Sequence, residues 1–136
     1  MAQSEVCAGN CGFSARIDVQ KLDNKHVQVI VRSECEQISA MNSDLARIQW
    51  KGRGHEVFGR LTDSVVYRSA DKHIRHSGCP IPAAILKTIE IEVGIALPQD
   101  VTVKFTNSQS EDANNTPPKE QETALPSPQE NLKAYE

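Results

Sequence analysis

The segment at residues 76–82, His-Ser-Gly-Cys-Pro-Ile-Pro, holds the side chains best suited to chemistry. Its imidazole and its thiol, His76 and Cys79, lie three residues apart, just before a predicted helix. Cys79 takes the N-cap position of this helix and Pro80 the first helical position, where a missing N–H group costs nothing. The thiol should therefore face the unpaired N–H groups and the positive end of the helix dipole, which lowers its pKa. Such a thiolate can bind a metal or attack another sulfur atom.

Two further cysteines are brought together by a predicted hairpin. Residues 13–31 contain two runs of alternating apolar and polar side chains, which indicate half-buried strands with odd-numbered residues facing the core. Cross-strand partners face the same side of a sheet, which favours a three-residue turn at 23–25 and position sums of 46 or 48. A position sum of 46 sets Cys11 opposite Cys35. A position sum of 48 sets Phe13 opposite Cys35, and Cys11 then lies one step further along the sheet. In both registers the two thiols approach each other at the open end of the hairpin.

Three helices and one more strand are predicted after the hairpin. The helices cover residues 33–48, 63–74 and 80–93, and their apolar residues recur at helical spacing. The first opens with a Ser-x-x-Glu capping box at 33–36, and Asp63 or Ser64 caps the second. Alternation at 101–105 indicates a third strand. These elements define a small α+β domain at 11–106, with a three-stranded, mainly antiparallel sheet packed with two or three helices.

The two ends of the chain differ from this single domain in composition. Residues 1–10 are small or polar and are interpreted as a flexible leader. Residues 107–136 should be disordered, because their few apolar side chains cannot bury enough surface to offset the entropy of ordering. This tail carries six acids and two lysines, so the net charge of −3 on the 136-residue chain belongs to the tail.

Composition argues against several classes of protein. The chain has no secretory signal and no apolar run long enough to cross a membrane, so we expect a cytoplasmic protein whose thiols stay reduced. Its four cysteines are then ligands or reactive groups rather than two disulfides. Residues 47–75 carry seven basic and three acidic side chains and are interpreted as a solvated surface, since Trp50 alone makes no stacking platform for nucleic acid. No hydrolase motif is present, which favours a binding or carrier protein over an enzyme.

Three thiols converge if the last helix packs on the sheet with its N-terminus at the open end of the hairpin. Cys11, Cys35 and Cys79 then form one site, to which His76 adds a fourth ligand in a Cys₃His set or Cys7 in a Cys₄ set. Such sets hold zinc or an iron–sulfur cluster, in a redox, delivery or structural role, and the choice between them stays open. We expect a protein partner for electron, metal or sulfur transfer, and an open sheet edge would permit a homodimer.

Five short motifs are spread over residues 10–106. They are Cys11-Gly12-Phe13, Ser33-x-Cys35, His76-x-x-Cys79-Pro80-x-Pro82, Lys87-x-Ile89-Glu90 and Ala96-Leu97-Pro98-x-Asp100-Val101. Together they resemble an uncharacterised family of small bacterial and archaeal proteins, a domain of unknown function. The resemblance brings no established activity and implies only that Cys11, Cys35, His76 and Cys79 belong together.

The residues Cys-Pro-Ile-Pro at 79–82, at the start of a predicted helix, carry a second resemblance. They are similar to the CPxP element of the sulfur-carrier proteins of tRNA thiolation and sulfur metabolism. By that resemblance Cys79 carries a persulfide and hands it to a partner. His76 would then be its proton partner, and Cys11 or Cys35 would be resolving thiols.

Overall fold

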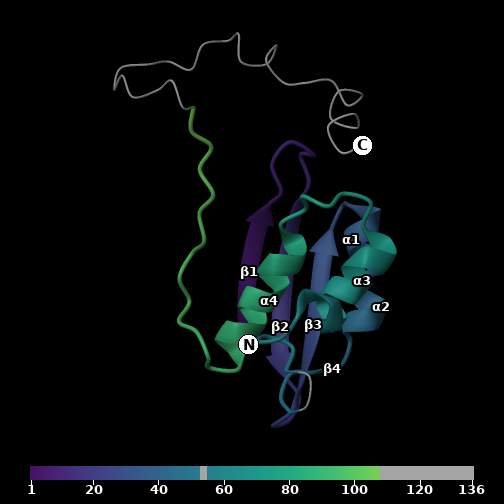
Figure 1. Ribbon diagram of the computed structural model, residues 1–136, viewed down its shortest axis with the longest axis vertical. Coiled ribbons are helices and arrows are strands. Elements are labelled where there is room, and N and C mark those ends of the chain that lie inside the picture. Colours follow the sequence, from purple (N-terminus) through teal and green to yellow (C-terminus); the bar gives the residue numbers. More distant parts are fainter. Residues whose placement is uncertain (53–54, 108–136) are drawn as a thin grey trace. The chain divides into compact units, whose positions relative to one another are not determined.

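The computed structural model describes residues 1–52 and 55–107, and residues 1–99 form one compact unit. The elements of this unit, in chain order, are β1 (Ala2–Cys7), β2 (Ser14–Lys21), β3 (His26–Ser33), α1 (Glu36–Ala40), α2 (Asn42–Leu45), β4 (Ile48–Gln49), the 3₁₀ helix η1 (Leu61–Asp63), α3 (Val65–His73) and α4 (Ile81–Glu92). Helix α4 lies over β1 and β2, and α1 and α2 lie against β3 (Figure 1). The predicted α+β class is therefore confirmed.

The sheet has the strand order β1-β2-β3-β4, and every neighbouring pair is antiparallel. Ala15 pairs with Ser33, a position sum of 48, which is the second of the two predicted registers. The backbone N–H of Leu22 donates to the carbonyl of His26 at 2.9 Å and closes the predicted turn at 23–25. Odd-numbered residues of β2 and β3 face the helices, as the alternation predicted.

The sheet has four strands, so the prediction of three was wrong. Residues 2–7, expected to lie in a flexible leader, form the edge strand β1, whose small inward residues are too weakly apolar to reveal a strand in the sequence. The strand expected at 101–105 is absent, and these residues have no regular structure. Their alternation shows only a local preference for extended backbone, and a strand also needs a neighbouring strand to pair with. The expected disordered tail at 107–136 lies, apart from its first residue, outside the described residues.

The predicted helix at 33–48 is divided in two at Met41. Asn42 accounts for the division, because its side chain accepts the N–H of Val31 and donates to the carbonyl of the same residue, both at 2.7 Å. The chain is thereby fixed to the backbone of β3. The predicted capping box is also wrong: Cys35 is the N-cap, and the Ser33 hydroxyl accepts the N–H of Cys35 at 3.1 Å.

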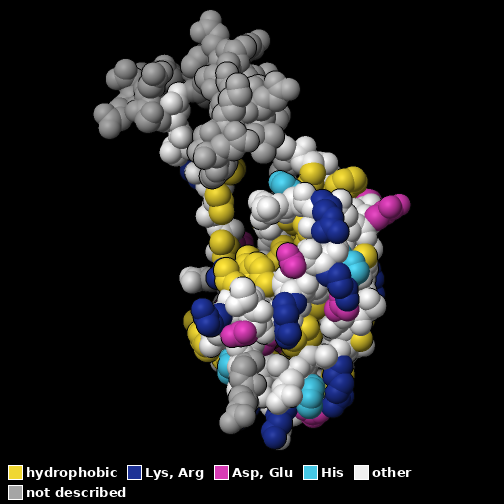
Figure 2. Space-filling model, turned by 45° about the vertical axis from the view of Figure 1, so that its right-hand side comes forward, with side chains coloured by type: hydrophobic (Ala, Val, Ile, Leu, Met, Phe, Trp, Pro, Cys, Tyr) yellow, Lys and Arg dark blue, Asp and Glu magenta, His cyan; other side chains and the backbone are white. Residues whose placement is uncertain are grey.

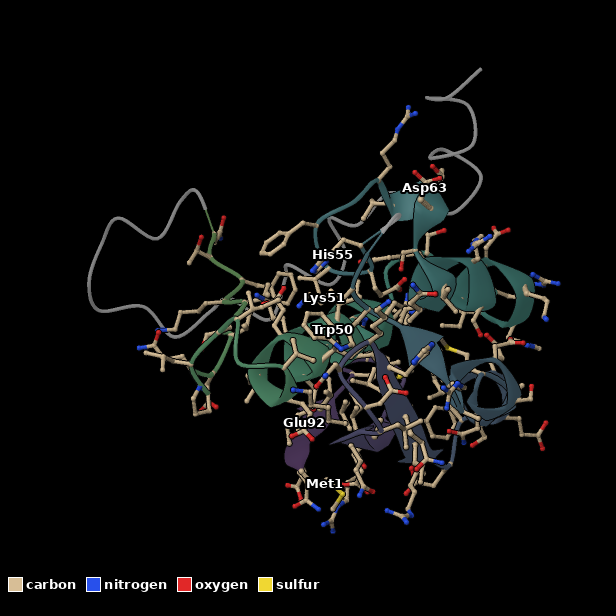
Figure 3. The ribbon with its side chains drawn as sticks, turned by 90° about the horizontal axis from the view of Figure 1, so that it is seen from below. Met1, Trp50, Lys51, His55, Asp63 and Glu92 are labelled. Atoms are coloured by element: carbon tan, nitrogen blue, oxygen red, sulfur yellow. The ribbon has the colours of Figure 1, made fainter. Side chains whose placement is uncertain are left out.

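The core is aliphatic and fills the space between the sheet and the helices. Its largest fully buried side chains are Ile17, Met41, Leu45, Ile48, Ile81, Ile85, Ile89, Val19, Val27, Val29, Val31 and Val66. Burying each such side chain contributes about 1.5–3 kcal/mol. Polar contacts also fix α4 on β1, since the hydroxyls of Ser4 and Thr88 lie 2.7 Å apart and the Met1 ammonium lies 3.4 Å from Glu92 (Figure 3). No helix within the described ranges combines the length and the apolar character needed to cross a membrane.

A buried carboxylate precedes α3, in a segment where the sequence predicts neither helix nor strand. Glu56 is only 4% exposed and binds the N-terminus of the helix. Its oxygens accept the Ser64 hydroxyl at 2.6 Å and the backbone N–H groups of Val65 and Val66 at 2.9 and 3.0 Å. The Ser64 hydroxyl in turn accepts the N–H of Tyr67, which confirms Ser64 as the cap. A negative charge at this end of a helix satisfies free N–H groups and complements the dipole.

Asp23 should make the β2–β3 turn sensitive to acid. Its carboxylate accepts the N–H groups of Lys25 and His26, which together with the His26 side chain lower its pKa from 3.8 to about 2. The ionised form therefore stabilises the turn fully above pH 3.8, and this stabilisation is lost as the pH falls toward about 2. Carboxyl NMR should show Asp23 titrating near pH 2. A midpoint near 3.8 would contradict this, and Asp23→Asn should remove the acid sensitivity of the turn.

Candidate thiol site

A cavity of about 430 Å³ lies at the open end of the β2–β3 hairpin, and all four residues of the predicted Cys₃His set line it. Cys11 comes from the β1–β2 loop, Cys35 from the β3–α1 junction, and His76 and Cys79 from the α3–α4 connection. Figure 1 shows these three segments at the same end of the sheet. Much of the remaining wall is apolar, including Phe13, Ile38, Ile74 and Ile81. The structure thus brings together three thiols and an imidazole from distant parts of the sequence.

Cys11 is presented by a tight loop between β1 and β2. The N–H of Gly12 donates to the carbonyl of Gly9 at 2.9 Å, and the N–H of Ala8 donates to that of Phe13 at 3.1 Å. Gly9 and Gly12 have φ angles of +89° and +76°, which residues with a side chain rarely adopt. Cys11 is exposed in this loop, so the cavity is accessible from solvent on this side.

Cys35 is held where β3 passes into α1. Its N–H donates to the Ser33 hydroxyl, which itself donates to the carbonyl of Ser14 at 2.7 Å. Its carbonyl accepts the N–H of Ser39 at 3.1 Å. Cys35 is half-buried and packs against the core. Its backbone is therefore bonded on both sides, to the sheet and to the helix.

Cys79 ends a turn that is closed by its own N–H, which donates to the carbonyl of His76 at 3.1 Å. The N-cap of α4 is Pro80, so the prediction that Cys79 is the cap was wrong by one residue. Burial is the largest influence on the Cys79 thiol and raises its pKa, and Cys35 and Cys11 raise it further. The N–H of Ile81 acts in the opposite direction but does not outweigh burial. The predicted lowering of this pKa was therefore wrong.

The segment that carries His76 and Cys79 is tied to α1 by a residue that the sequence did not single out. The Gln37 side chain accepts the backbone N–H of Arg75 at 2.8 Å and also lines the cavity. This bond joins the α3–α4 connection to the helix that follows Cys35. A glutamine in a short helix has no motif that would have revealed this role.

Cys7 does not line the cavity. It pairs with Ser14 across the β1–β2 ladder and faces the side of the sheet opposite to the helices. All four cysteines are free thiols. Within residues 1–52 and 55–107, no three His, Cys, Asp or Glu side chains form a group that could hold a metal ion as they stand.

The basic stretch at 47–75 contributes to a mixed surface. On the face seen in Figure 2, Lys and Arg side chains are interspersed with Asp and Glu rather than gathered in one patch. Lys72, for example, lies 3.1 Å from Asp44, which also accepts the Ser69 hydroxyl and contacts His73. The hydroxyl of Ser69, then Lys72 and His73, lower the pKa of Asp44.

The fold and the cavity define a small α+β protein with a thiol-lined cavity at one end of its sheet. The chain belongs to a family of unknown function (DUF6951), whose sequence model matches residues 2–105. The match agrees with the coarser expectation of a domain of unknown function. No curated protein and no solved structure matches the chain.

Proposed function

We propose that the chain binds an iron–sulfur cluster through Cys11, Cys35 and Cys79, with His76 as a candidate fourth ligand. The observation that carries the proposal is the single cavity that these side chains share. Thiolates are the usual ligands of such clusters, and an imidazole replaces them in some. Zinc accepts the same ligands. The cavity is open to solvent at Cys11 and could hold either group, so the metal and sulfide content decides between them.

The protonated state of Cys79 suits a site whose thiols lose their protons only when the cofactor binds. With its raised pKa, Cys79 keeps its proton in the unliganded chain, which avoids placing several thiolates side by side. A metal-bound thiol loses its proton, so binding should release protons and become tighter as the pH rises. The exposure of Cys11 leaves the cofactor accessible, which suits transfer of electrons, metal or sulfur to a protein partner.

Purification under argon, followed by iron, sulfide and zinc analysis and a visible absorption spectrum, tests the proposal. We expect iron and sulfide in equal amounts and broad visible absorption that bleaches on reduction. Zinc without sulfide would mean that the site holds a structural zinc ion and no cluster. Absence of all three after anaerobic reconstitution with ferrous iron and sulfide, and with zinc, would refute metal binding.

An alternative function is sulfur transfer with Cys79 as the nucleophile. His76 and Cys79 line a second cavity as well as the first, so two cavities give access to this thiol. The Cys79 sulfur would attack the outer sulfur of a donor persulfide, giving a Cys79 persulfide and a donor thiol. His76 would take the Cys79 proton and return it to the leaving thiolate. The wild-type chain should then gain the mass of one sulfur atom, and Cys79→Ser should not.

A further inference from the structure

A second cavity, of about 470 Å³, lies against the α3–α4 connection. It shares Ile74, His76 and Cys79 with the thiol cavity, so these residues separate the two spaces. The other walls differ in chemistry. They come from η1, α3 and the α3–α4 connection and carry hydroxyl and charged groups, those of Thr62, Tyr67, Arg68, Asp71 and Ser77.

The two charged side chains of this cavity are available to a ligand. Arg68 donates through Nε to the carbonyl of Ser64 at 3.4 Å and through Nη2 to that of Asp63 at 3.5 Å. In the described part of the chain, Nη1 of Arg68 and the carboxylate of Asp71 have no hydrogen bond or ion pair. They lie three residues apart, on one face of α3. One positive and one negative group therefore border the same space without forming an ion pair with each other.

We infer that this cavity binds a small zwitterionic thiol, of which L-cysteine is the simplest. Its carboxylate would pair with Arg68, its ammonium with Asp71, and its thiol would lie beside Cys79 and His76. An anion alone would be repelled by Asp71 and a cation alone by Arg68, so the charge pair selects a ligand that carries both signs. The inference goes beyond the proposed cluster. The two proposals share Cys79 and His76, but neither Cys11 nor Cys35 lines the second cavity, so L-cysteine binding and metal content are measured separately.

Calorimetric titration of the full chain as purified, reduced and under argon, tests this inference. L-cysteine should bind with at least about tenfold higher affinity than cysteamine, which lacks the carboxylate, or 3-mercaptopropionate, which lacks the ammonium. L-serine should also bind more weakly, because it lacks the sulfur atom. Amide NMR signals of α3 and of the 76–79 turn should shift on binding.

Two variants test which part of L-cysteine each charged side chain binds. Arg68→Gln should weaken L-cysteine binding about tenfold and abolish the preference over cysteamine, and Asp71→Asn should abolish the preference over 3-mercaptopropionate. Arg75→Gln is the matched control, since Arg75 lies nearby but does not line the cavity. Circular dichroism and the thermal midpoint establish that each variant is folded. No binding of L-cysteine at millimolar concentration, or equal affinity in wild type and Arg68→Gln, would overturn the inference. The iron and sulfide content of the same sample tests the proposed cluster separately.

Discussion

Replacing Cys79 with serine should reduce iron and sulfide binding more than 100-fold. A serine hydroxyl stays protonated where a thiol ionises on binding metal, and even changes in residues that only support metal ligands cost about 10–100-fold in affinity. Cys11→Ser and Cys35→Ser should have the same effect, because the three thiols line one cavity. The measurement is iron and sulfide per chain, with the visible spectrum, after anaerobic reconstitution.

The control is Cys7→Ser, which removes a thiol from the opposite face of the sheet. It should bind as much iron and sulfide as the wild type. If it lost as much as the other three variants, or if Cys79→Ser kept its cluster, the assignment of ligands would be wrong. Circular dichroism of the metal-free variants separates the loss of a ligand from the loss of the fold.

Replacing Glu56 with alanine should destabilise the protein by about 2–4 kcal/mol. The change leaves the Ser64 hydroxyl and two N–H groups of the first turn of α3 without their acceptor in a buried place. Glu56→Gln keeps one acceptor oxygen and should cost less. The midpoint of urea unfolding measures both effects.

Glu34→Ala is the matched control for this prediction, because Glu34 is exposed. It should change the free energy of unfolding by no more than about 0.5 kcal/mol. An equal effect of Glu34→Ala and Glu56→Ala would mean that the Glu56 carboxylate does not stabilise the start of α3.

The parts of the fold that were predicted correctly depend on local patterns. Alternation over β2 and β3 sets which residues face the core, and a turn of three residues then restricts the register to a few values. Ser64 marked the start of α3 because a hydroxyl suits the N-cap. Pro80 marked the start of α4 to within one residue, because proline has no N–H group to leave unpaired at a helix start.

The parts that failed depend on contacts between distant segments. The break between α1 and α2 follows from the bonds of Asn42 to Val31, which no local pattern reveals. The inward residues of β1 are partly covered by α4, which contacts that strand, so weakly apolar side chains suffice there. The pKa of Cys79 was misjudged because helix position is visible in the sequence, whereas burial is a property of the folded chain.

The meeting of the three thiols at one cavity was predicted, whereas the surroundings of that cavity were missed. Hairpin register and helix start together placed Cys11, Cys35 and Cys79 at one end of the sheet, and the structure has all three on one cavity. The anchoring of the connection by Gln37 and the charge pair of Arg68 and Asp71 were not foreseen. These side chains belong to ordinary helices, where a polar residue is usually only solvated.

The three thiols of the cavity are 24 and 44 positions apart in the chain, so a cofactor bound to all of them would act as a cross-link. It would close two long loops and thereby reduce the entropy of the unfolded chain, in the way that a disulfide does. Unlike a disulfide, this link could be removed by a chelator. The protein's resistance to heat would then depend on the supply of iron and on the oxidant around it, without any change in its covalent backbone.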